Sequence, residues 1–228
     1  MNISEIYQSV QGEGELQGTT STFVRVAGCN LRCWFCDTPF ASWKPEGEDH
    51  SLEEIMQRVS NDSAQHVVLT GGEPMLFAEM IPLTQQLHRL GKHITVETAG
   101  TLFLPVACDL MSISPKLQNS DPSEELAGKW SARHQRDRHR PEVIHQLLSQ
   151  YHCQLKFVID RPEDIQDVED YLSEFPFVRQ SQVWLMPQGT DAQQLLQKET
   201  WLLPACQERD WHLCRRKHIE WFGHRRGV

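Results

Sequence analysis

Three cysteines stand close together in this chain of 228 residues, and they carry its clearest chemistry. Cys29, Cys33 and Cys36 follow a Cys-x₃-Cys-x₂-Cys spacing, with no fourth thiol nearby. A structural zinc site takes four protein ligands, and a four-iron cluster usually takes four thiolates. Three thiolates on one short loop can hold three irons of a [4Fe–4S] cluster and leave the fourth iron open. Since an open iron can bind a small molecule and pass it an electron, this spacing predicts a catalytic cluster.

The same loop resembles the signature of radical S-adenosylmethionine (SAM) enzymes, because an aromatic residue, Phe35, precedes the last cysteine. This resemblance implies that the chain binds a [4Fe–4S] cluster and SAM and generates a radical with them. Two alternatives stay open. One is an unrelated metal or disulfide loop. The other is a zinc or iron–sulfur module without catalysis, which would need Asp37 or His50 as a fourth ligand.

Strands and helices must bring such a loop to a binding site, and their sequence pattern is regular. Short β-branched runs alternate with longer helical patterns, which is typical of parallel α/β folds. The predicted strands are 21–26, 66–70, 93–97, 110–113, 154–159 and 182–186, and the predicted helices are 51–58, 78–90, 141–150, 162–175 and 191–209. Six strands are fewer than the eight of a closed barrel. The predicted fold class is α/β, an incomplete parallel β/α barrel of about six strands, of the radical SAM type.

Polar or glycine-rich motifs follow nearly every predicted strand. They are Gly28-Cys29, Gly71-Gly72-Glu73-Pro74, Glu97-Thr98-Ala99-Gly100, Ser114-Pro115-Lys116 and Pro187-Gln188-Gly189. Because the carboxyl ends of parallel strands meet at one rim of a β/α barrel, these motifs are predicted to surround one site.

The overall composition describes an acidic protein that fits one domain over residues 1–228. The net charge of −9 gives no basis for nucleic-acid binding as a whole. No apolar run reaches membrane-spanning length, and the N-terminus has no signal-peptide pattern. Seven cysteines, three of them clustered, fit a reducing compartment better than a disulfide framework. We therefore expect a cytoplasmic protein with neither nucleic-acid nor membrane partners.

Two stretches depart from the strand–helix alternation. The basic stretch from Gly128 to Arg140 is predicted to be an irregular, solvated loop. The last residues, 218–228, include Trp221, Phe222 and two glycines, whereas frayed termini are usually plain and polar. We therefore expect the C-terminal tail to pack against the domain and to fold over the site.

The radical SAM resemblance assigns SAM contacts to two of the motifs. Gly72 matches the position that contacts the methionine amino group, and paired glycines let a backbone approach a ligand closely. Ser114, Pro115 and Lys116 match contacts to the ribose and the carboxylate, and they supply a hydroxyl, a rigid turn and a cation. Gln188 is a candidate for contact with the adenosyl group.

A second, more specific resemblance extends from end to end and rests on four parts of the sequence. They are Ser9-Val10-Gln11-Gly12-Glu13-Gly14, Arg25, Cys36-Asp37-Thr38 and the terminal Trp221 to Val228. These parts resemble the 7-carboxy-7-deazaguanine synthases, a family of radical SAM enzymes. The resemblance implies a carbon–nitrogen lyase that contracts the ring of 6-carboxy-5,6,7,8-tetrahydropterin and releases ammonia, on the route to queuosine.

The chemistry of a pterin suits the residues of these motifs. Its aminopyrimidinone edge presents two adjacent N–H donors, which one carboxylate can accept as a pair. Glu13 is the candidate for that carboxylate, with Gln11 and the backbone of Val10 and Gly12 beside it. Arg25 is a suitable partner for the carboxylate of the substrate. Structural alternatives are an N-terminal turn for the glycine-rich motif and a salt bridge at the barrel edge for Arg25.

The same resemblance implies a magnesium ion and further substrate contacts. Thr38 matches the metal-contacting position, although a single hydroxyl is a weak ligand, so the ion would bind only together with substrate. The alternative for Thr38 is a helix or turn cap. Thr70 matches a substrate-contacting position, Glu97 is a further pocket candidate, and the free carboxylate of Val228 is predicted to line the pocket. The sequence assigns no catalytic side chain beyond the cluster and SAM.

The family resemblance also implies partners: a homodimer, and a flavodoxin or ferredoxin as reductant. The nearest alternative among enzymes is another radical SAM member, such as an activase that installs a glycyl radical on a partner protein. Such an activase would have no use for residues 11–14 or for a packed tail.

Overall fold

One curved sheet of nine strands forms the centre of the computed structural model, which describes all residues from Met1 to Val228. Seven neighbouring strands are parallel. The six longer ones are, in order, β2 (Thr20–Val26), β4 (His66–Gly71), β5 (His93–Thr98), β6 (Leu110–Ile113), β7 (Cys153–Ile159) and β8 (Val183–Pro187). These six agree with the six predicted strands to within one residue at each end. The seventh is the two-residue β9 (His212–Leu213), next to β8. The sheet does not close on itself, because β9 and β3 (Glu48–Asp49) form its two edges. The prediction of an incomplete parallel β/α barrel is confirmed.

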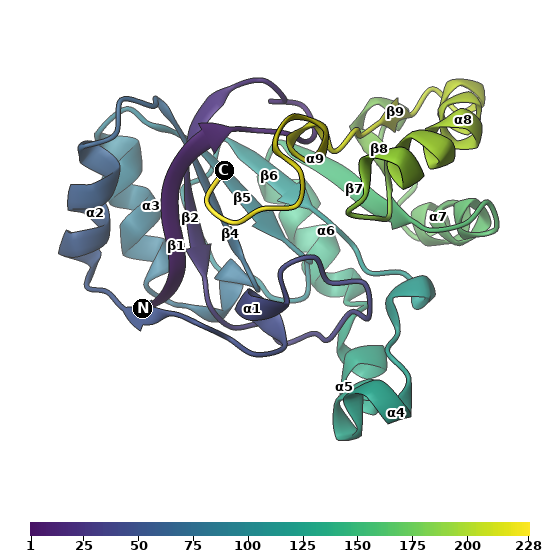
Figure 1. Cartoon of the computed structure of the whole chain (residues 1–228), viewed down its shortest axis with the longest axis horizontal. Coiled ribbons are helices and arrows are strands. Elements are labelled where there is room, and N and C mark those ends of the chain that lie inside the picture. Colours follow the sequence, from purple (N-terminus) through teal and green to yellow (C-terminus); the bar gives the residue numbers. More distant parts are fainter.

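Five helices join the parallel strands and lie on the outer side of the sheet (Figure 1). They are α2 (Leu52–Ser60), α3 (Met80–Arg89), α6 (Pro141–Gln150), α7 (Asp164–Ser173) and α8 (Ala192–Glu208), and each coincides with a predicted helix. The start of α2 shows how the sequence sets a boundary. The Ser51 hydroxyl accepts from the Glu54 backbone N–H, and the Glu54 carboxylate accepts from the Ser51 backbone N–H, which forms a capping box.

The N-terminal segment differs from the sequence-based expectation, which placed no strand before residue 20. Residues Asn2–Val10 form β1, which pairs antiparallel with β2, and β3 (Glu48–Asp49) extends that edge. The pattern of β1 is hard to recognise because Ser4, Glu5 and Gln8 interrupt its apolar residues. This strand brings the glycine-rich motif of residues 9–14 to the rim of the sheet.

The prediction of an irregular loop for the basic stretch is also wrong, because most of it forms α5 (Lys129–Asp137). A second short helix, α4 (Glu124–Ala127), lies directly before it. Helix α5 buries Ser131 and His134, three residues apart, and exposes most of its cations. This spacing is that of an amphipathic helix, but its buried face is polar, so hydrophobic periodicity does not reveal it. The two helices project away from the sheet (Figure 1).

The remaining elements are short. They are α1 (Pro39–Ser42), β9 (His212–Leu213), α9 (Lys217–Phe222) and the 3₁₀ turns Pro74–Leu76, Gln118–Ser120 and Gln180–Gln182. After α9 the chain crosses in front of the sheet and ends there (Figure 1). Trp221 remains 43% exposed. The tail is therefore not held by burial of this aromatic side chain, in contrast to the reasoning from sequence.

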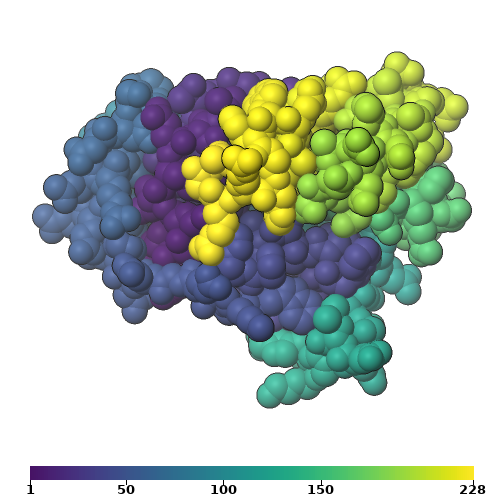
Figure 2. All heavy atoms as spheres, viewed as in Figure 1, coloured from purple at the N-terminus to yellow at the C-terminus, as the bar shows by residue number.

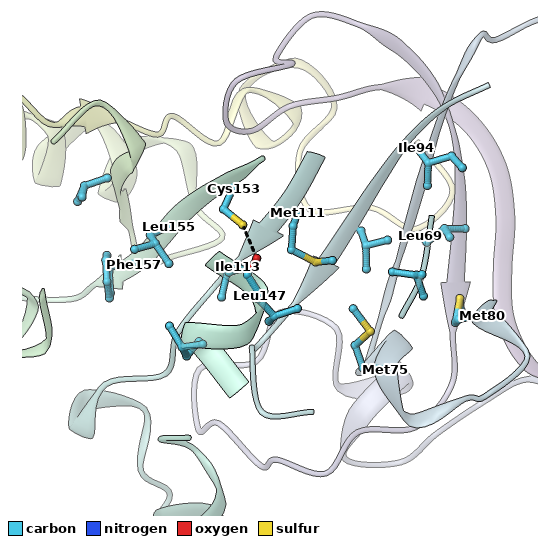
Figure 3. Packing of buried hydrophobic residues seen from close by; sticks show 14 of the residues in the cluster. Leu69, Met75, Met80, Ile94, Met111, Ile113, Leu147, Cys153, Leu155 and Phe157 are labelled. Atoms are coloured by element: carbon cyan, nitrogen blue, oxygen red, sulfur yellow. Dashed lines mark hydrogen bonds between the residues drawn. The ribbon is translucent and has the colours of Figure 1, made fainter. Parts of the chain in front are cut away.

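The hydrophobic core lies between the sheet and its outer helices (Figure 3). Leu69, Met111 and Phe157 project from three of the parallel strands, β4, β6 and β7, into this core and are fully buried. Because side chains alternate along a strand, the residues next to them face the concave side of the sheet. Thr70 and Lys156 are two of these, so the concave side is polar and available for a site. No helix is long and apolar enough to cross a membrane.

Candidate functional site

One cavity of about 470 Å³ lies on the concave side of the sheet and is the candidate site. Its walls consist of inward-facing strand residues and of the loops at the carboxyl ends of the strands. Of the residues predicted from sequence to form a site, Pro115 alone lies outside its lining. The others all line it: Val10, Gln11, Gly12, Glu13, Arg25, Cys29, Cys33, Cys36, Thr38, Thr70, Gly72, Glu97, Ser114, Lys116, Gln188 and Val228.

The cysteine loop follows β2 and contributes all three of its thiols to the cavity wall. Burial raises the pKa values of Cys29 and Cys33 to about 12, so both are neutral thiols until a metal displaces their protons. All seven cysteines of the chain are free, so the loop contains no disulfide in this structure.

The donor set of this loop fits a cluster with one open iron better than a single ion. No group of three His, Cys, Asp or Glu side chains is close enough to hold one metal ion. Thiolates that bind separate irons of a cluster stand farther apart than the ligands of one ion. Neither side chain named as a fourth zinc ligand joins the cysteines: Asp37 pairs with Arg216, and His50 lies outside the cavity, 3.8 Å from Glu54.

Gly72 fixes the cysteine loop to the end of β4 through backbone contacts. Its N–H donates to the Val26 carbonyl (3.1 Å), and the Glu73 N–H donates to the carbonyl of Gly28, the residue before Cys29 (2.8 Å). A Cβ atom added to Gly72 would lie 2.0 Å from the Gly28 oxygen. The glycine is thus needed for backbone packing beneath the loop, in addition to any approach to a ligand.

Glu73 connects the ends of two strands from a fully buried position. Its carboxylate accepts from the Met75 N–H (3.0 Å), the Thr98 hydroxyl (2.8 Å) and the Ala99 N–H (2.8 Å). Burial raises the pKa of Glu73, and these hydrogen bonds only partly offset it. The Gly-Gly-Glu-Pro motif therefore holds the rim in shape between β4 and β5.

The other candidates for SAM contact lie at the ends of β6 and β8. Lys116 Nζ donates to the Ser114 carbonyl (2.5 Å) and hydroxyl (2.7 Å), which holds this cation at the cavity wall. Gln188 Oε1 accepts from Lys198 Nζ (3.1 Å), which orients the amide. Pro115 lies between two lining residues without lining the cavity itself, so it acts on the shape of the turn.

The cysteine loop is supported from behind by α5. The Arg32 N–H donates to His134 Nδ1 (3.0 Å), and His134 Nε2 lies 3.0 Å from the Ser120 hydroxyl. Burial lowers the pKa of His134 to about 4, so its ring is neutral and can accept at Nδ1. The Arg32 guanidinium stacks 4.0 Å from the centre of the Trp130 ring. This helix was predicted as solvated loop, and it is instead part of the structure that holds the cysteines.

Glu13 lies on the opposite wall among three basic side chains. Its carboxylate hydrogen-bonds Lys156 Nζ and lies 3.3 Å from Arg216 Nε and 3.8 Å from His218 Nδ1. Burial opposes ionisation of Glu13, but the charges of Lys156 and Arg216 outweigh it and lower its pKa well below the usual range. Glu13 is therefore a fully ionised acceptor at neutral pH.

Arg216 joins three segments that are far apart in sequence. Besides Glu13, its guanidinium contacts the Asp37 carboxylate in the cysteine loop and the Gly189 carbonyl after β8. The Arg216 side chain is 5% exposed. Burial opposes ionisation of Asp37 too, and Arg216 again outweighs it, so the pKa of Asp37 is lowered. One cation thus ties the substrate candidate Glu13 to the cysteine loop.

Gln11, Thr70 and Glu97 form a second connected group. Glu97 accepts from Gln11 Nε2 (3.2 Å) and from the Thr70 hydroxyl (2.8 Å). Its carboxylate also lies 4.0 Å from Lys156 Nζ. Three residues predicted separately as substrate contacts are therefore hydrogen-bonded to one another, and Lys156 connects them to Glu13.

Arg25 projects from β2 toward β1. Its Nε donates to Glu5 (3.0 Å), and its Nη2 donates to the Tyr7 hydroxyl (3.1 Å). Burial opposes the charge of Arg25, but Tyr7 and Glu5 favour it, and its pKa is raised. The salt bridge named as the structural alternative is therefore present, and it leaves further guanidinium N–H donors at the cavity wall.

Thr38 occupies the N-cap position of α1, yet its side chain makes no capping hydrogen bond. Its hydroxyl lies 3.8 Å from Cys36 Sγ and lines the cavity. The alternative role of Thr38 as a side-chain cap is therefore not supported.

The C-terminal tail covers part of the cavity (Figure 2). Polar contacts hold it: His224 Nε2 lies 3.0 Å from the Asp37 carbonyl, and Arg226 lies 3.2 Å from Glu5 and 2.9 Å from Glu46. Where α9 begins, the Lys217 N–H donates to the Gly12 carbonyl (3.0 Å).

Gly12 belongs to the glycine-rich motif of residues 9–14. A Cβ atom on Gly12 would lie 2.6 Å from the His218 backbone nitrogen. The absence of a side chain at Gly12 therefore allows the close packing of α9.

Sequence reasoning missed several residues of this site. Lys156, Arg216, Glu5, Tyr7 and His218 all line the cavity. Lys156 carries a usable signal, because a lysine between Leu155 and Phe157 in a strand buried on both sides needs a partner. Arg216 carries no such signal, since it stands in the basic run 215–217.

The chain is similar to known proteins. Residues 23–116 match the model of the radical SAM superfamily. The chain is 43% identical over 227 residues to the 7-carboxy-7-deazaguanine synthase of Rhodopirellula baltica, which covers 99% of this chain and 88% of that relative. It is 40% identical to the 7-carboxy-7-deazaguanine synthase of Halobacterium salinarum, over 95% of this chain and 88% of that one. Among solved structures, QueE from Escherichia coli shares the fold with a TM-score of 0.69 and 23% identity, over 94% of this chain and 92% of that one.

Proposed function

The chain belongs to the 7-carboxy-7-deazaguanine synthases, a family of radical SAM enzymes, and we propose that it converts 6-carboxy-5,6,7,8-tetrahydropterin to 7-carboxy-7-deazaguanine with release of ammonia. It is then a carbon–nitrogen lyase of queuosine biosynthesis. One observation carries the proposal. A single cavity joins three cysteines that lack a fourth protein ligand with the buried carboxylate of Glu13 and the guanidinium of Arg25.

Cys29, Cys33 and Cys36 would hold three irons of a [4Fe–4S] cluster and leave one iron for SAM. When bound, the cluster and SAM supply a carbon-centred radical that can take a hydrogen atom from the substrate. Gly72, Ser114, Lys116 and Gln188 would hold SAM from the ends of β4, β6 and β8, and Pro115 would fix the turn between two of them. The protein's contribution is to hold the reacting carbon within reach and to exclude water.

The opposite wall would hold the pterin. Glu13, kept ionised by Lys156 and Arg216, would accept the two N–H donors of the aminopyrimidinone edge. The free donors of Arg25 would bind the substrate carboxylate. The remaining contacts would come from Gln11, Thr70, Glu97, the backbone of Val10 and Gly12, and the terminal carboxylate of Val228.

Magnesium would bind at Thr38 when substrate is present. The Thr38 hydroxyl makes no capping hydrogen bond and lies 3.8 Å from Cys36 Sγ, which supports this assignment. Because Mg²⁺ keeps few protein ligands, most of its coordination would come from the substrate carboxylate and water. The ion would then fix the substrate next to the cluster.

The proposal extends to the setting of the reaction. Seven free cysteines favour a reducing compartment, so we place the enzyme in the cytoplasm. A flavodoxin or ferredoxin would reduce the cluster there. The family resemblance alone supports a homodimer.

Anaerobic turnover is the decisive test. Protein reconstituted with iron and sulfide would be reduced with dithionite and incubated with SAM, Mg²⁺ and 6-carboxy-5,6,7,8-tetrahydropterin. Mass spectrometry should detect 7-carboxy-7-deazaguanine, and its amount should fall when Mg²⁺ is omitted. Cleavage of SAM to 5′-deoxyadenosine without this product would contradict the substrate and favour another radical SAM enzyme, such as an activase. A metal centre whose EPR spectrum does not respond to SAM would contradict the radical SAM assignment itself.

A further inference from the structure

The outer face of α5 and the neighbouring Trp34 form a surface that the reaction at the cavity does not use. We propose that this surface docks the small acidic protein that delivers single electrons to the cluster. The inference rests on the proposed function, since it assumes a cluster that needs reduction. In the step concerned, the carrier loses one electron and the [4Fe–4S] cluster gains it, passing from the 2+ to the 1+ state.

The cysteine loop presents alternate residues to opposite sides. Leu31, Cys33 and Phe35 line the cavity, whereas Arg32 and Trp34 do not. Trp34 is 43% exposed, and its indole N–H donates to the Asn119 carbonyl (2.7 Å), which fixes it in place. The loop that carries the cluster ligands therefore reaches the protein surface at Trp34. An electron entering here has a short path to the thiol of Cys33.

Helix α5 touches this outer side of the loop directly. Its His134 accepts the Arg32 N–H (3.0 Å), and its Trp130 stacks on the Arg32 guanidinium (4.0 Å). The helix and its neighbour α4 project beside the segment that carries the cysteines (Figures 1 and 2). A carrier that sits on α5 would therefore cover Trp34 and stand next to the cluster.

The charge of α5 is suited to an acidic partner. The exposed cations on and beside it are Lys129, Arg133, Arg136 and Arg140, on a chain with a net charge of −9. Asp137 is the one carboxylate of α5, and Arg133 and Arg136 share it, so positive charge remains in excess on this helix. Three exposed carboxylates lie nearby: Glu124 and Glu125 belong to α4, and Glu142 lies 3.8 Å from Arg140.

An acidic carrier would be repelled by most of this acidic molecule and attracted at a local basic face, which orients the encounter. Exposed tryptophan and arginine are also the residue types that anchor protein interfaces. The cavity mouth offers no comparable access. The tail covers part of it, and SAM would occupy the cavity in the reaction that the test follows.

Electron transfer to the cluster can be measured without any pterin, so the test is independent of the substrate assignment. Reconstituted enzyme with SAM would be mixed with an acidic flavodoxin in its hydroquinone form, and formation of the flavin semiquinone would be followed by stopped flow. The test variant is Lys129→Gln/Arg133→Gln/Arg136→Gln, in which glutamine preserves helix propensity. The matched control is Arg58→Gln/Arg89→Gln/Arg179→Gln, which removes three exposed cations elsewhere.

We expect the second-order rate constant of the α5 variant to fall about tenfold in roughly 20 mM salt, and less than about twofold in roughly 300 mM salt, because screening removes steering. The control variant should keep the wild-type rate constant. Reduction by dithionite, which needs no docking, should be equally fast in all three proteins. As a second variant, Trp34→Ala should slow the flavodoxin reaction at both salt concentrations.

Three results would overturn the inference. One is an equal loss of rate in the two triple variants, which would reflect total charge alone. Another is a flavodoxin rate in the α5 variant equal to that of the wild type at low salt. The third is a parallel loss of the dithionite rate or of bound iron, which would make α5 a support for the loop and nothing more.

Discussion

The two walls of the cavity are built in different ways. The wall that carries the cysteines is held by backbone hydrogen bonds and by the buried carboxylate of Glu73, between loops that follow adjacent strands. The wall that carries Glu13 is held by side-chain charges from distant parts of the chain, because Lys156 and Arg216 lie 143 and 203 residues away in sequence. The structure of the first wall is fixed by backbone packing, whereas the structure of the second depends on the balance between its charged side chains.

This difference separates the effects expected from mutations. A change in the cysteine wall should alter iron content and SAM cleavage together. A change in the charged wall should weaken substrate binding and stability while the cluster stays intact. Variants that mix these outcomes would show that the two walls are not independent.

The largest effect should follow removal of one cluster ligand. Cys33→Ser should lower bound iron well below the about four atoms of a full cluster and reduce product formation at least ~10³-fold. Iron analysis, the visible absorbance of the reconstituted protein and the anaerobic assay would measure these changes. Cys108→Ser, which changes a free thiol outside the cavity, should keep both iron and activity. A Cys33→Ser protein with a full cluster would mean that the thiol is not a ligand.

Arg216→Gln should have the next largest effect, because it removes a buried cation from Glu13, whose side chain is 13% exposed, and from the more exposed Asp37. Removal of one partner of a buried ion pair costs about 3–5 kcal/mol of unfolding free energy. Urea unfolding of the metal-free protein would measure the loss, and the KM for substrate should rise about tenfold or more. Iron content should stay at the wild-type level.

The adjacent Arg215 is the matched control for Arg216. It pairs with Glu199 at 2.9 Å on the surface, with 45% of its side chain exposed. Arg215→Gln should therefore cost at most about 1 kcal/mol. Equal losses in the two variants would contradict the importance of the buried network, and iron loss in Arg216→Gln would contradict the independence of the two walls.

Gly72→Ala should disturb the backbone packing of the cysteine wall. The new methyl group would collide with the Gly28 carbonyl, and such overpacking costs about 1–3 kcal/mol. Displacement of Gly28 should also reduce bound iron, since Cys29 follows it directly. Gly91→Ala is a suitable control because Gly91 has a positive φ of 71° but open space around its Cβ. It should cost about 1 kcal/mol and leave iron unchanged; an unchanged iron content in Gly72→Ala would weaken the assigned role of this contact.

Acid should weaken the charged wall. The folded-state pKa of Glu13 lies below its unfolded value, so Glu13 contributes stability that is complete above about pH 4.3 and is lost as the pH falls. Glu73 has the opposite sign, because burial raises its pKa. Between pH 5 and pH 3, the free energy of unfolding of Glu13→Gln should therefore decline by about 1–2 kcal/mol less than that of the wild type.

Urea unfolding of metal-free protein at several pH values would measure this difference. The control is Glu53→Gln, which changes an exposed carboxylate of α2 and should leave the decline close to that of the wild type. A Glu13→Gln protein with an undiminished decline would show that other groups dominate the acid response.

Much of this protein follows from short stretches of its sequence. Strand and helix patterns act over about ten residues, so the six parallel strands and five outer helices could be predicted with nearly correct ends. The cysteine triplet and the Gly-Gly-Glu-Pro motif are equally local, and alternation along parallel strands places them at one rim. The elements that were missed have local patterns that mislead: β1 is interrupted by polar residues, and α5 buries a polar face.

The charged wall depended on the tertiary structure. A residue such as Arg216 makes favourable contacts with whichever carboxylates the folded chain brings near it, and no spacing in the sequence specifies them. The position of Lys156 in a buried strand predicts an acidic partner, but the sequence does not specify which residue it is. Coulomb interactions act through space between side chains that the backbone path brings together, so their partners become known only when the whole sheet and the C-terminal tail are in place.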